Sequence, residues 1–153
     1  MKKSPRDQDL ASLLGPSKFS ADGFLGDDPR EPDQIIADDM RELEKTGVEK
    51  TTLVSALRDV YRKAETALGN PVKITDHLTA EYIESRGKVP SPFRGDGMFQ
   101  KGEVDLKDDS TGKSVIFTAL SISLIEKHDF FQGRGSRYRL EPAEIVELLG
   151  LKK

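Results

Sequence analysis

The stretch GEVDLKDDSTGKSVIFT, residues 102–118, decides the fold class. It holds two short runs in which apolar and polar residues alternate, on either side of the segment DDSTG. Successive side chains of a strand point to opposite faces, so each run would present one apolar face. Asp and Gly residues suit the turn between them. The stretch therefore predicts an antiparallel hairpin in which Val104 and Leu106 lie opposite Val115 and Phe117.

The residues before the hairpin also alternate. Val72 and Ile74 do so first, and Leu78, Ala80 and Tyr82 follow. This pattern favours extended structure up to residues 86–87, although 78–86 also fits a short helix closed by a glycine. Two prolines and three glycines in GKVPSPFRGDG, residues 87–97, predict a loop.

The residues after the hairpin predict helices. Over 119–129 an alternating strand pattern competes with a helical step, and the charged end EKHD favours a helix that starts near Thr118. A long buried strand is the alternative there. RYRL, residues 137–140, is expected to be extended. A last helix should begin at Pro142 and end before Gly150.

Two regular helical patterns precede the sheet. Ile36, Met40 and Leu43 fall on one face of a first helix, which Gly47 should end. A second helix carries one apolar stripe, and the short link at 46–50 predicts an antiparallel helical hairpin. The stripe consists of Leu53, Leu57, Val60, Tyr61, Ala64 and Leu68.

These patterns predict an α+β protein: an N-terminal helical hairpin, then a small, mainly antiparallel sheet with two further helices. A chain of 153 residues suits one domain, which we place at 31–153. Residues 1–30 lack sustained periodicity and are rich in Ser, Pro, Gly and Asp. We expect them to be a flexible or docked extension.

Composition limits the function classes. A net charge of -3, from 24 basic and 27 acidic residues, argues against nucleic acid as a partner. The absence of cysteine excludes disulfides, thiolate catalysis and cysteine-ligated metals. Neither a signal peptide nor a membrane-spanning segment is indicated, so we expect a soluble, cytoplasmic protein.

The segment HDFFQGRGSRYRL, residues 128–140, carries most of the residues suited to ligand binding. A phosphate-binding glycine loop follows a strand and precedes a helix, whereas Gly133 and Gly135 follow a predicted helix. We therefore expect these glycines to end that helix.

The arginines of this segment predict a cationic corner. In an extended RYRL, Arg137 and Arg139 would point to one side and Tyr138 to the other. Together with Arg134 in the loop and with Lys127 and His128 at the helix end, they would suit a carboxylate or phosphate. We favour the alternative, in which the acids that follow neutralise them internally; these are Glu141, Glu144 and Glu147.

Catalytic and metal signatures are absent from the sequence. His77 and His128 have acidic neighbours but form no HExxH pattern, and no serine lies in a GxSxG or SxxK motif. We therefore predict no metal, no cofactor and no particular enzyme activity.

The favoured function is a non-catalytic binding or interaction module with a protein partner or self-association. The alternative is an enzyme or sensor that binds an anionic small molecule at the 128–139 segment. Its site residues would be His128, Arg134, Arg137, Tyr138 and Arg139, with His128 exchanging a proton.

Overall fold

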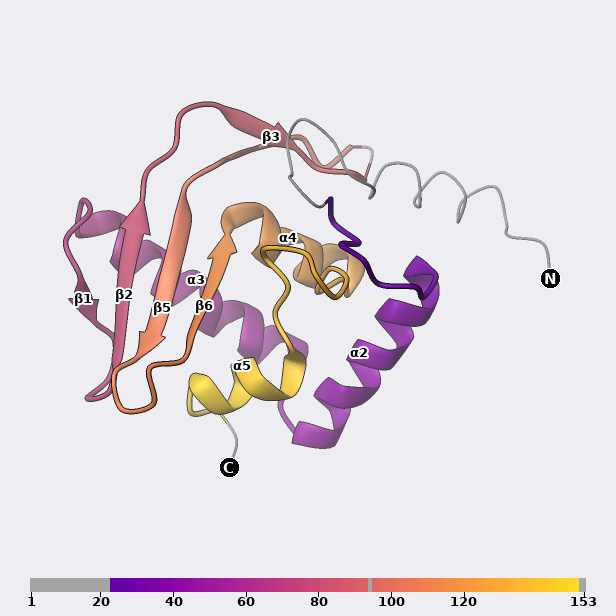
Figure 1. Cartoon of the computed structure of the whole chain (residues 1–153), viewed down its shortest axis with the longest axis horizontal. Coiled ribbons are helices and arrows are strands. Elements are labelled where there is room, and N and C mark those ends of the chain that lie inside the picture. Colours follow the sequence, from indigo (N-terminus) through magenta and orange to yellow (C-terminus); the bar gives the residue numbers. More distant parts are fainter. Residues whose placement is uncertain (1–22, 94, 152–153) are drawn as a thin grey trace.

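The structure is a computed structural model that describes residues 23–93 and 95–151. Its elements follow one another along the chain as Figure 1 shows. In order they are α2 (Pro32–Thr46), α3 (Lys50–Thr66), β1 (Val72–Lys73), β2 (Leu78–Ile83), β3 (Lys88–Pro90), β4 (Met98–Gln100), β5 (Glu103–Asp108), β6 (Ser114–Thr118), α4 (Ala119–His128) and α5 (Pro142–Leu148). The predicted α+β class is confirmed. Among the described residues, no helix is both long and apolar enough to cross a membrane.

The main sheet has the strand order β1-β2-β5-β6, and every neighbouring pair is antiparallel. Val104 lies opposite Phe117 and Leu106 opposite Val115, as the hairpin pattern predicts. Residues 78–83 form a strand, which confirms the extended interpretation over the short helix. The sequence pattern was sufficient to predict these strands and their pairing. Apolar residues alternate with polar ones, and only one register places all the apolar side chains on the buried face.

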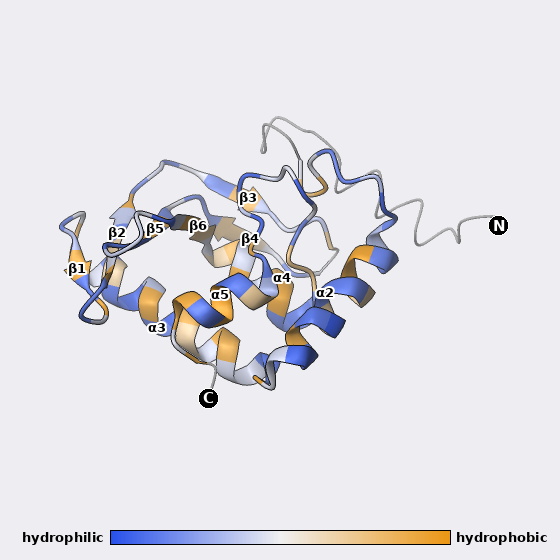
Figure 2. Ribbon diagram, turned by 60° about the horizontal axis from the view of Figure 1, so that its bottom comes forward, coloured by the Kyte–Doolittle hydropathy of each residue, from blue (hydrophilic) through white to orange (hydrophobic). Residues whose placement is uncertain are grey.

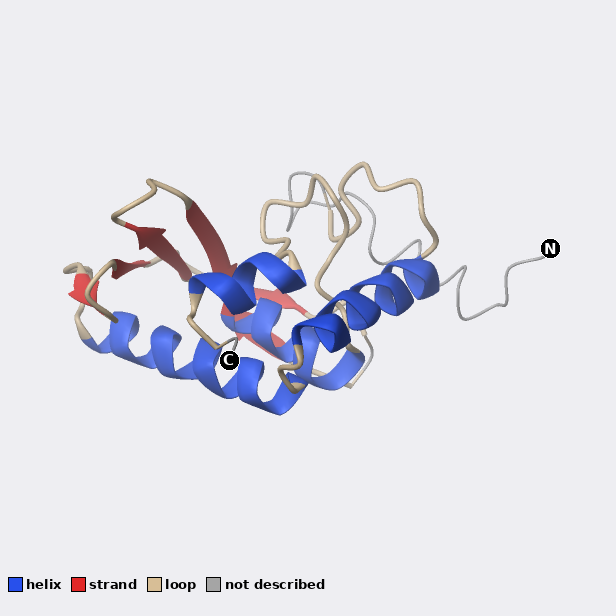
Figure 3. Ribbon diagram, turned by 90° about the horizontal axis from the view of Figure 1, so that it is seen from below, coloured by secondary structure: helices blue, strands red, loops and turns tan. Residues whose placement is uncertain are grey.

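One face of this sheet packs against α3, which runs along one side of it in Figure 3. We call the cluster between them, together with parts of α4 and α5, the sheet core. Most of the predicted stripe on α3 is confirmed, because Leu53, Leu57, Val60 and Ala64 are buried. Leu68 is the exception: it lies beyond the helix end and is 87% exposed. The fully buried members of the sheet core include Leu53, Leu57, Leu78, Val104, Leu106 and Phe117.

The two N-terminal helices are consecutive and joined by a short link at Gly47, as predicted. Each packs mainly against a C-terminal helix, α2 against α5 and α3 against α4. Figure 2 shows hydrophilic and hydrophobic residues on different sides of these helices. The predicted face of α2 is displaced by one residue, because Ile35, Asp39 and Leu43 are buried. Asp39 belongs to this face although it is charged, since Arg139 pairs with it.

The helix prediction for 119–129 is confirmed, and the alternative of a buried strand is wrong. Thr118 caps α4: its Oγ1 accepts a hydrogen bond from the Ser121 N–H, and the Ser121 Oγ accepts one from the Thr118 N–H. This reciprocal cap satisfies two backbone donors at the point where β6 becomes α4. Pro142 opens α5 as predicted.

Two local predictions are wrong. Part of the expected loop at 87–97 forms β3, which pairs with β4; Pro90 lies at the end of that short strand, where a proline is tolerated. RYRL is not extended, because the Arg139 N–H donates to the Ser136 carbonyl and closes a turn. The side-chain alternation expected for 137–140 is therefore lost.

A second apolar cluster, the loop core, lies beside α2 and α4. It contains Phe24, Ile35, Val89, Phe93, Leu120, Leu124 and Phe130. Most of its aromatic members come from segments outside helices and strands. This cluster is what attaches the α4–α5 connection and the residues around Phe24 to the rest of the domain.

Residues 24–28 dock on the α4–α5 connection. The Gly133 N–H donates to the Phe24 carbonyl at 2.8 Å, and the Asp27 N–H donates to the Arg134 carbonyl at 3.0 Å. A Cβ at Gly133 would lie 2.1 Å from the Leu25 carbonyl oxygen, so this approach requires glycine. Residues 1–22 of the predicted extension lie outside the described residues.

The expected role of the two glycines is also wrong. The C-cap of α4 is Asp129, which adopts the left-handed conformation with φ 55. Gly133 and Gly135 instead make room for the backbone and side chains of residues 25–27. Sequence order alone did not reveal this, because the packing partner lies about a hundred residues earlier in the chain.

Candidate functional site

The predicted arginines do not converge on one open site. Arg139 lies against Asp39, with Nη1 and Nη2 at 2.8 and 2.9 Å from its carboxylate oxygens, and its Nε donates to Glu141 at 2.8 Å. Its side chain is only 6% exposed. Burial disfavours its charged form, but the hydrogen bonds to Asp39 and Glu141 outweigh that and raise its pKa. Arg139 therefore ties α2 to the start of α5 and has little capacity left for a ligand.

Arg137 and Arg134 lie elsewhere. Arg137 reaches the carboxylate of Glu103 on β5 at 3.0 Å, and its own side chain is 55% exposed. Arg134 is exposed and borders a shallow hollow next to Arg30 and Glu141. The predicted internal neutralisation holds for Glu141. Glu144 and Glu147 line a different hollow, beside His77 and Lys113.

His128 is fixed against the 91–97 loop. Its Nε2 lies 2.8 Å from Asp96 Oδ2, and its ring stacks on Phe93 with centroids 3.7 Å apart. The Ser91 hydroxyl donates to the same Asp96 oxygen at 2.9 Å. A serine nucleophile would need to contact the imidazole, so these three residues are not arranged for nucleophilic catalysis. Within residues 23–93 and 95–151, no group of acidic and histidine side chains is placed to hold a metal ion.

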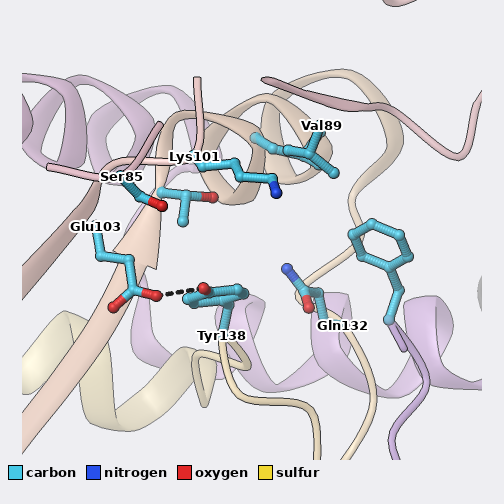
Figure 4. A pocket seen from close by; sticks show the side chains of 9 residues that line it. Ser85, Val89, Lys101, Glu103, Gln132 and Tyr138 are labelled. Carbon is cyan, nitrogen blue, oxygen red and sulfur yellow. Dashed lines mark hydrogen bonds between the residues drawn. The ribbon is translucent and has the colours of Figure 1, made fainter. Parts of the chain in front are cut away.

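A cavity of about 220 Å³ lies between the sheet, the start of α4 and the α4–α5 connection. Figure 4 shows its lining side chains from close by. They are Phe24, Ser85, Val89, Lys101, Glu103, Thr118, Leu120, Gln132 and Tyr138. Phe24, Val89 and Leu120 belong to the loop core, so the cavity has one apolar wall.

Gln132 is the most unusual residue of this cavity. It is 2% exposed, and its backbone has a positive φ of 72 although it is not a glycine. Its Oε1 accepts a hydrogen bond from the Ser136 hydroxyl at 2.6 Å, and its backbone carbonyl accepts one from Arg139 at 2.5 Å. Its Nε2 donates to no described residue and points into the cavity in Figure 4. The amide nitrogen therefore offers its N–H donors to a molecule in the cavity.

Lys101 and Glu103 face the cavity from β5 and the residues before it. The ammonium of Lys101 extends into the cavity in Figure 4 and forms no ion pair with a described carboxylate. Glu103 is already engaged: it accepts hydrogen bonds from Arg137 and from the Tyr138 hydroxyl. Burial works to raise the pKa of Glu103, but these two hydrogen bonds prevail and leave it lowered.

Tyr138 completes the cavity wall. Burial, followed by the hydrogen bond to Glu103, raises the pKa of its hydroxyl to about 12. The hydroxyl therefore stays protonated at neutral pH and keeps donating to Glu103. Charge-assisted hydrogen bonds from Arg137 and Tyr138 to the Glu103 carboxylate hold the cavity wall in place.

Of the predicted site residues, only Tyr138 lines the cavity. Sequence reasoning missed Lys101, Glu103 and Gln132. A signal existed for Gln132, a polar residue directly after two buried aromatics in FFQG. No comparable pattern marks Lys101, which reaches the cavity only because β4 and β5 bring it there.

In comparisons with known proteins, no family model, no curated protein and no solved structure matches this chain.

Proposed function

We propose that this protein is a binding module that takes up a small polar molecule in the cavity between β5, α4 and the α4–α5 connection. The observation that carries this proposal is Gln132, a residue only 2% exposed whose amide oxygen is held by Ser136 and whose amide nitrogen is directed into the cavity. The N–H donors of this amide nitrogen are available to an acceptor group of a bound molecule.

The cavity is preorganised, which supports binding. Ser136 holds the side-chain amide of Gln132, Arg139 holds its backbone carbonyl, and Glu103 holds Tyr138. A rigid site loses little conformational entropy when a ligand arrives. The left-handed backbone of Gln132 is a strained conformation, of the kind found at ligand sites, and costs roughly 1–3 kcal/mol.

No catalytic step is part of this proposal. Glu103 is the carboxylate nearest to the cavity, but it accepts hydrogen bonds from Arg137 and Tyr138 and has a lowered pKa, so it is a weak base. The Thr118 hydroxyl is engaged in the cap of α4. Because their hydrogen bonds already occupy Glu103 and Thr118, these residues are better suited to binding a ligand than to catalysis.

The proposed site in the cavity does not use the arginines of the site that the sequence predicted. It keeps Tyr138 from the 128–139 segment, whereas Arg137 and Arg139 serve neighbouring carboxylates. A protein partner, self-association and a cytoplasmic location also stay predictions from the sequence.

A matched pair of tryptophan variants tests the proposal. Ser85 is exposed and lines the cavity, whereas Glu84 is exposed and does not line it. A thermal-shift screen of small polar metabolites should identify ligands of the wild type. Ser85→Trp should abolish their effect by filling the cavity mouth, and Glu84→Trp should preserve it. A screen without any ligand, or binding that Ser85→Trp leaves unchanged, would overturn the proposal.

A further inference from the structure

The charges around the cavity leave one cation without a partner. Glu103 and Arg137 form an ion pair at 3.0 Å, so their charges offset each other at the cavity wall. Tyr138 is neutral at physiological pH, as a tyrosine ordinarily is, and its pKa is raised further, to about 12. Lys101 remains, half-buried and without an ion pair to any described carboxylate. The cavity therefore favours a ligand that carries one negative charge.

The hydrogen-bonding groups of the cavity also favour a negatively charged ligand. The Lys101 ammonium and the Gln132 amide nitrogen, which both offer N–H donors, are directed into the cavity from different elements (Figure 4). The acceptor oxygens of Glu103 already receive donors from Arg137 and Tyr138. A ligand group that fits between Lys101 and Gln132 must therefore present several acceptors and no donor.

Among singly charged groups, a carboxylate meets these requirements. A phosphate is usually bound by arginine forks or by a series of backbone N–H groups. Arg139 and Arg137, which hydrogen-bond to the cavity residues Gln132 and Glu103, are committed to Asp39, Glu141 and Glu103. One ammonium and one amide suit the smaller charge of a carboxylate.

The remaining wall limits the rest of the ligand. Phe24, Val89 and Leu120 are each less than 10% exposed and face the cavity with apolar atoms. The volume of about 220 Å³ is below the roughly 300–1,000 Å³ of pockets for drug-sized molecules. The ligand body must therefore be short and apolar.

We infer that the cavity binds a small monocarboxylate with a short apolar body. Its carboxylate lies between Lys101 and Gln132, and its apolar body lies against Phe24, Val89 and Leu120. This ligand class rests on the proposed function, since it names what the cavity takes up.

The experiment compares three molecules with the same branched alkyl body: isovalerate, isovaleramide and isopentylamine. Their affinities for the full chain are measured by titration, with NMR shifts or calorimetry as the readout. Isovalerate should bind at least about tenfold more tightly than the amide, since a hydrogen bond to a charged group is worth that much. The amine should not bind detectably.

Two lysine variants locate the effect. Lys101→Met keeps the length of the side chain but removes its charge, and it should abolish the preference for isovalerate over isovaleramide. Lys107→Met is the matched control, because Lys107 is an exposed lysine on β5 that does not line the cavity. It should leave both affinities unchanged. An equal loss in the two variants would show general charge attraction and would overturn the inference.

The other outcomes separate this inference from the proposed function. If amide and carboxylate bind equally well, or if the amine or inorganic phosphate binds best, the carboxylate assignment is overturned while the cavity remains a binding site. If the metabolite screen yields ligands but isovalerate does not bind, the assignment is likewise overturned. If no small molecule binds at all, both proposals fail together.

Discussion

The sheet core and the loop core differ in how the sequence builds them. Every large buried residue of the sheet core on β2, β5, β6 and α3 follows a period of two or of a helical turn. In the loop core, Phe24, Phe93 and Phe130 come from irregular segments, and the nearby residues Asp129 and Gln132 have left-handed backbones. The candidate site borders only the second cluster.

The difference between the two cores explains why the cavity lies beside the irregular segments and not beside the regular ones. The backbone groups of helices and paired strands are satisfied by regular hydrogen bonds, so the sheet core can be dense and apolar. Irregular segments satisfy their backbone groups one at a time, with side chains such as Asp28 and Arg139. The same irregularity leaves room for a cavity and for a buried amide that points into it.

The largest expected effect comes from the ion pair that joins the loop region to α2. Arg139→Ala should lower the free energy of unfolding by roughly 3–5 kcal/mol, because it leaves the buried carboxylate of Asp39 without its partner. Chemical denaturation measures this. Arg137→Ala is the control: its side chain is 55% exposed, so its loss should cost less than about 1 kcal/mol. Equal costs would show that the Asp39 pair is not critical to the loop region.

Truncation of a buried leucine in the sheet core should destabilise the protein. Leu57 is fully buried on α3, and Leu57→Ala should cost roughly 2–5 kcal/mol in chemical denaturation. Leu68→Ala, at a position that is 87% exposed, should change stability by no more than about 0.5 kcal/mol. A cost below about 1 kcal/mol for Leu57→Ala would contradict the assignment of α3 to the main core.

The docking of residues 24–28 depends on a glycine. Gly133→Ala should cost roughly 1–3 kcal/mol, because the new methyl group would collide with the Leu25 carbonyl. Gly150→Ala provides the contrast, since Gly150 has a positive φ of 68 but open space around it. Proteolysis near Phe24 should accelerate only in the Gly133 variant. Unchanged cleavage there would mean that the close approach does not hold the segment.

The smallest expected effect is a pH dependence at the same contact. Arg30, followed by the backbone N–H of Arg134, holds the pKa of Asp28 well below its ordinary value of 3.8. A carboxyl with a lower pKa in the folded state stabilises the protein above pH 4 and loses that contribution as the pH falls. The free energy of unfolding should thus decrease from pH 5 to pH 2, and less steeply in Asp28→Asn.

Much of the fold could be predicted because its evidence is local. The hairpin register, the stripe on α3 and the start of α5 at Pro142 each depend on residues within one or two elements. The predicted face of α2 is displaced because Ile35 and Asp39 are buried, whereas Ile36 and Met40 are only half-buried. The burial of Asp39 depends on Arg139, which lies 100 residues later in the chain.

The candidate site shows the same division. The sequence by itself determined that the 128–140 segment gathers arginines, glycines and aromatics, and that the fold is α+β with an antiparallel sheet. Only the tertiary structure decided that the arginines serve Glu103, Asp39 and Glu141, and that Lys101 and Gln132 face a shared cavity. The physical reason is range: apolar periodicity acts between residues a few positions apart, whereas the partner of a charge or an amide is whichever group the completed packing brings within hydrogen-bonding distance.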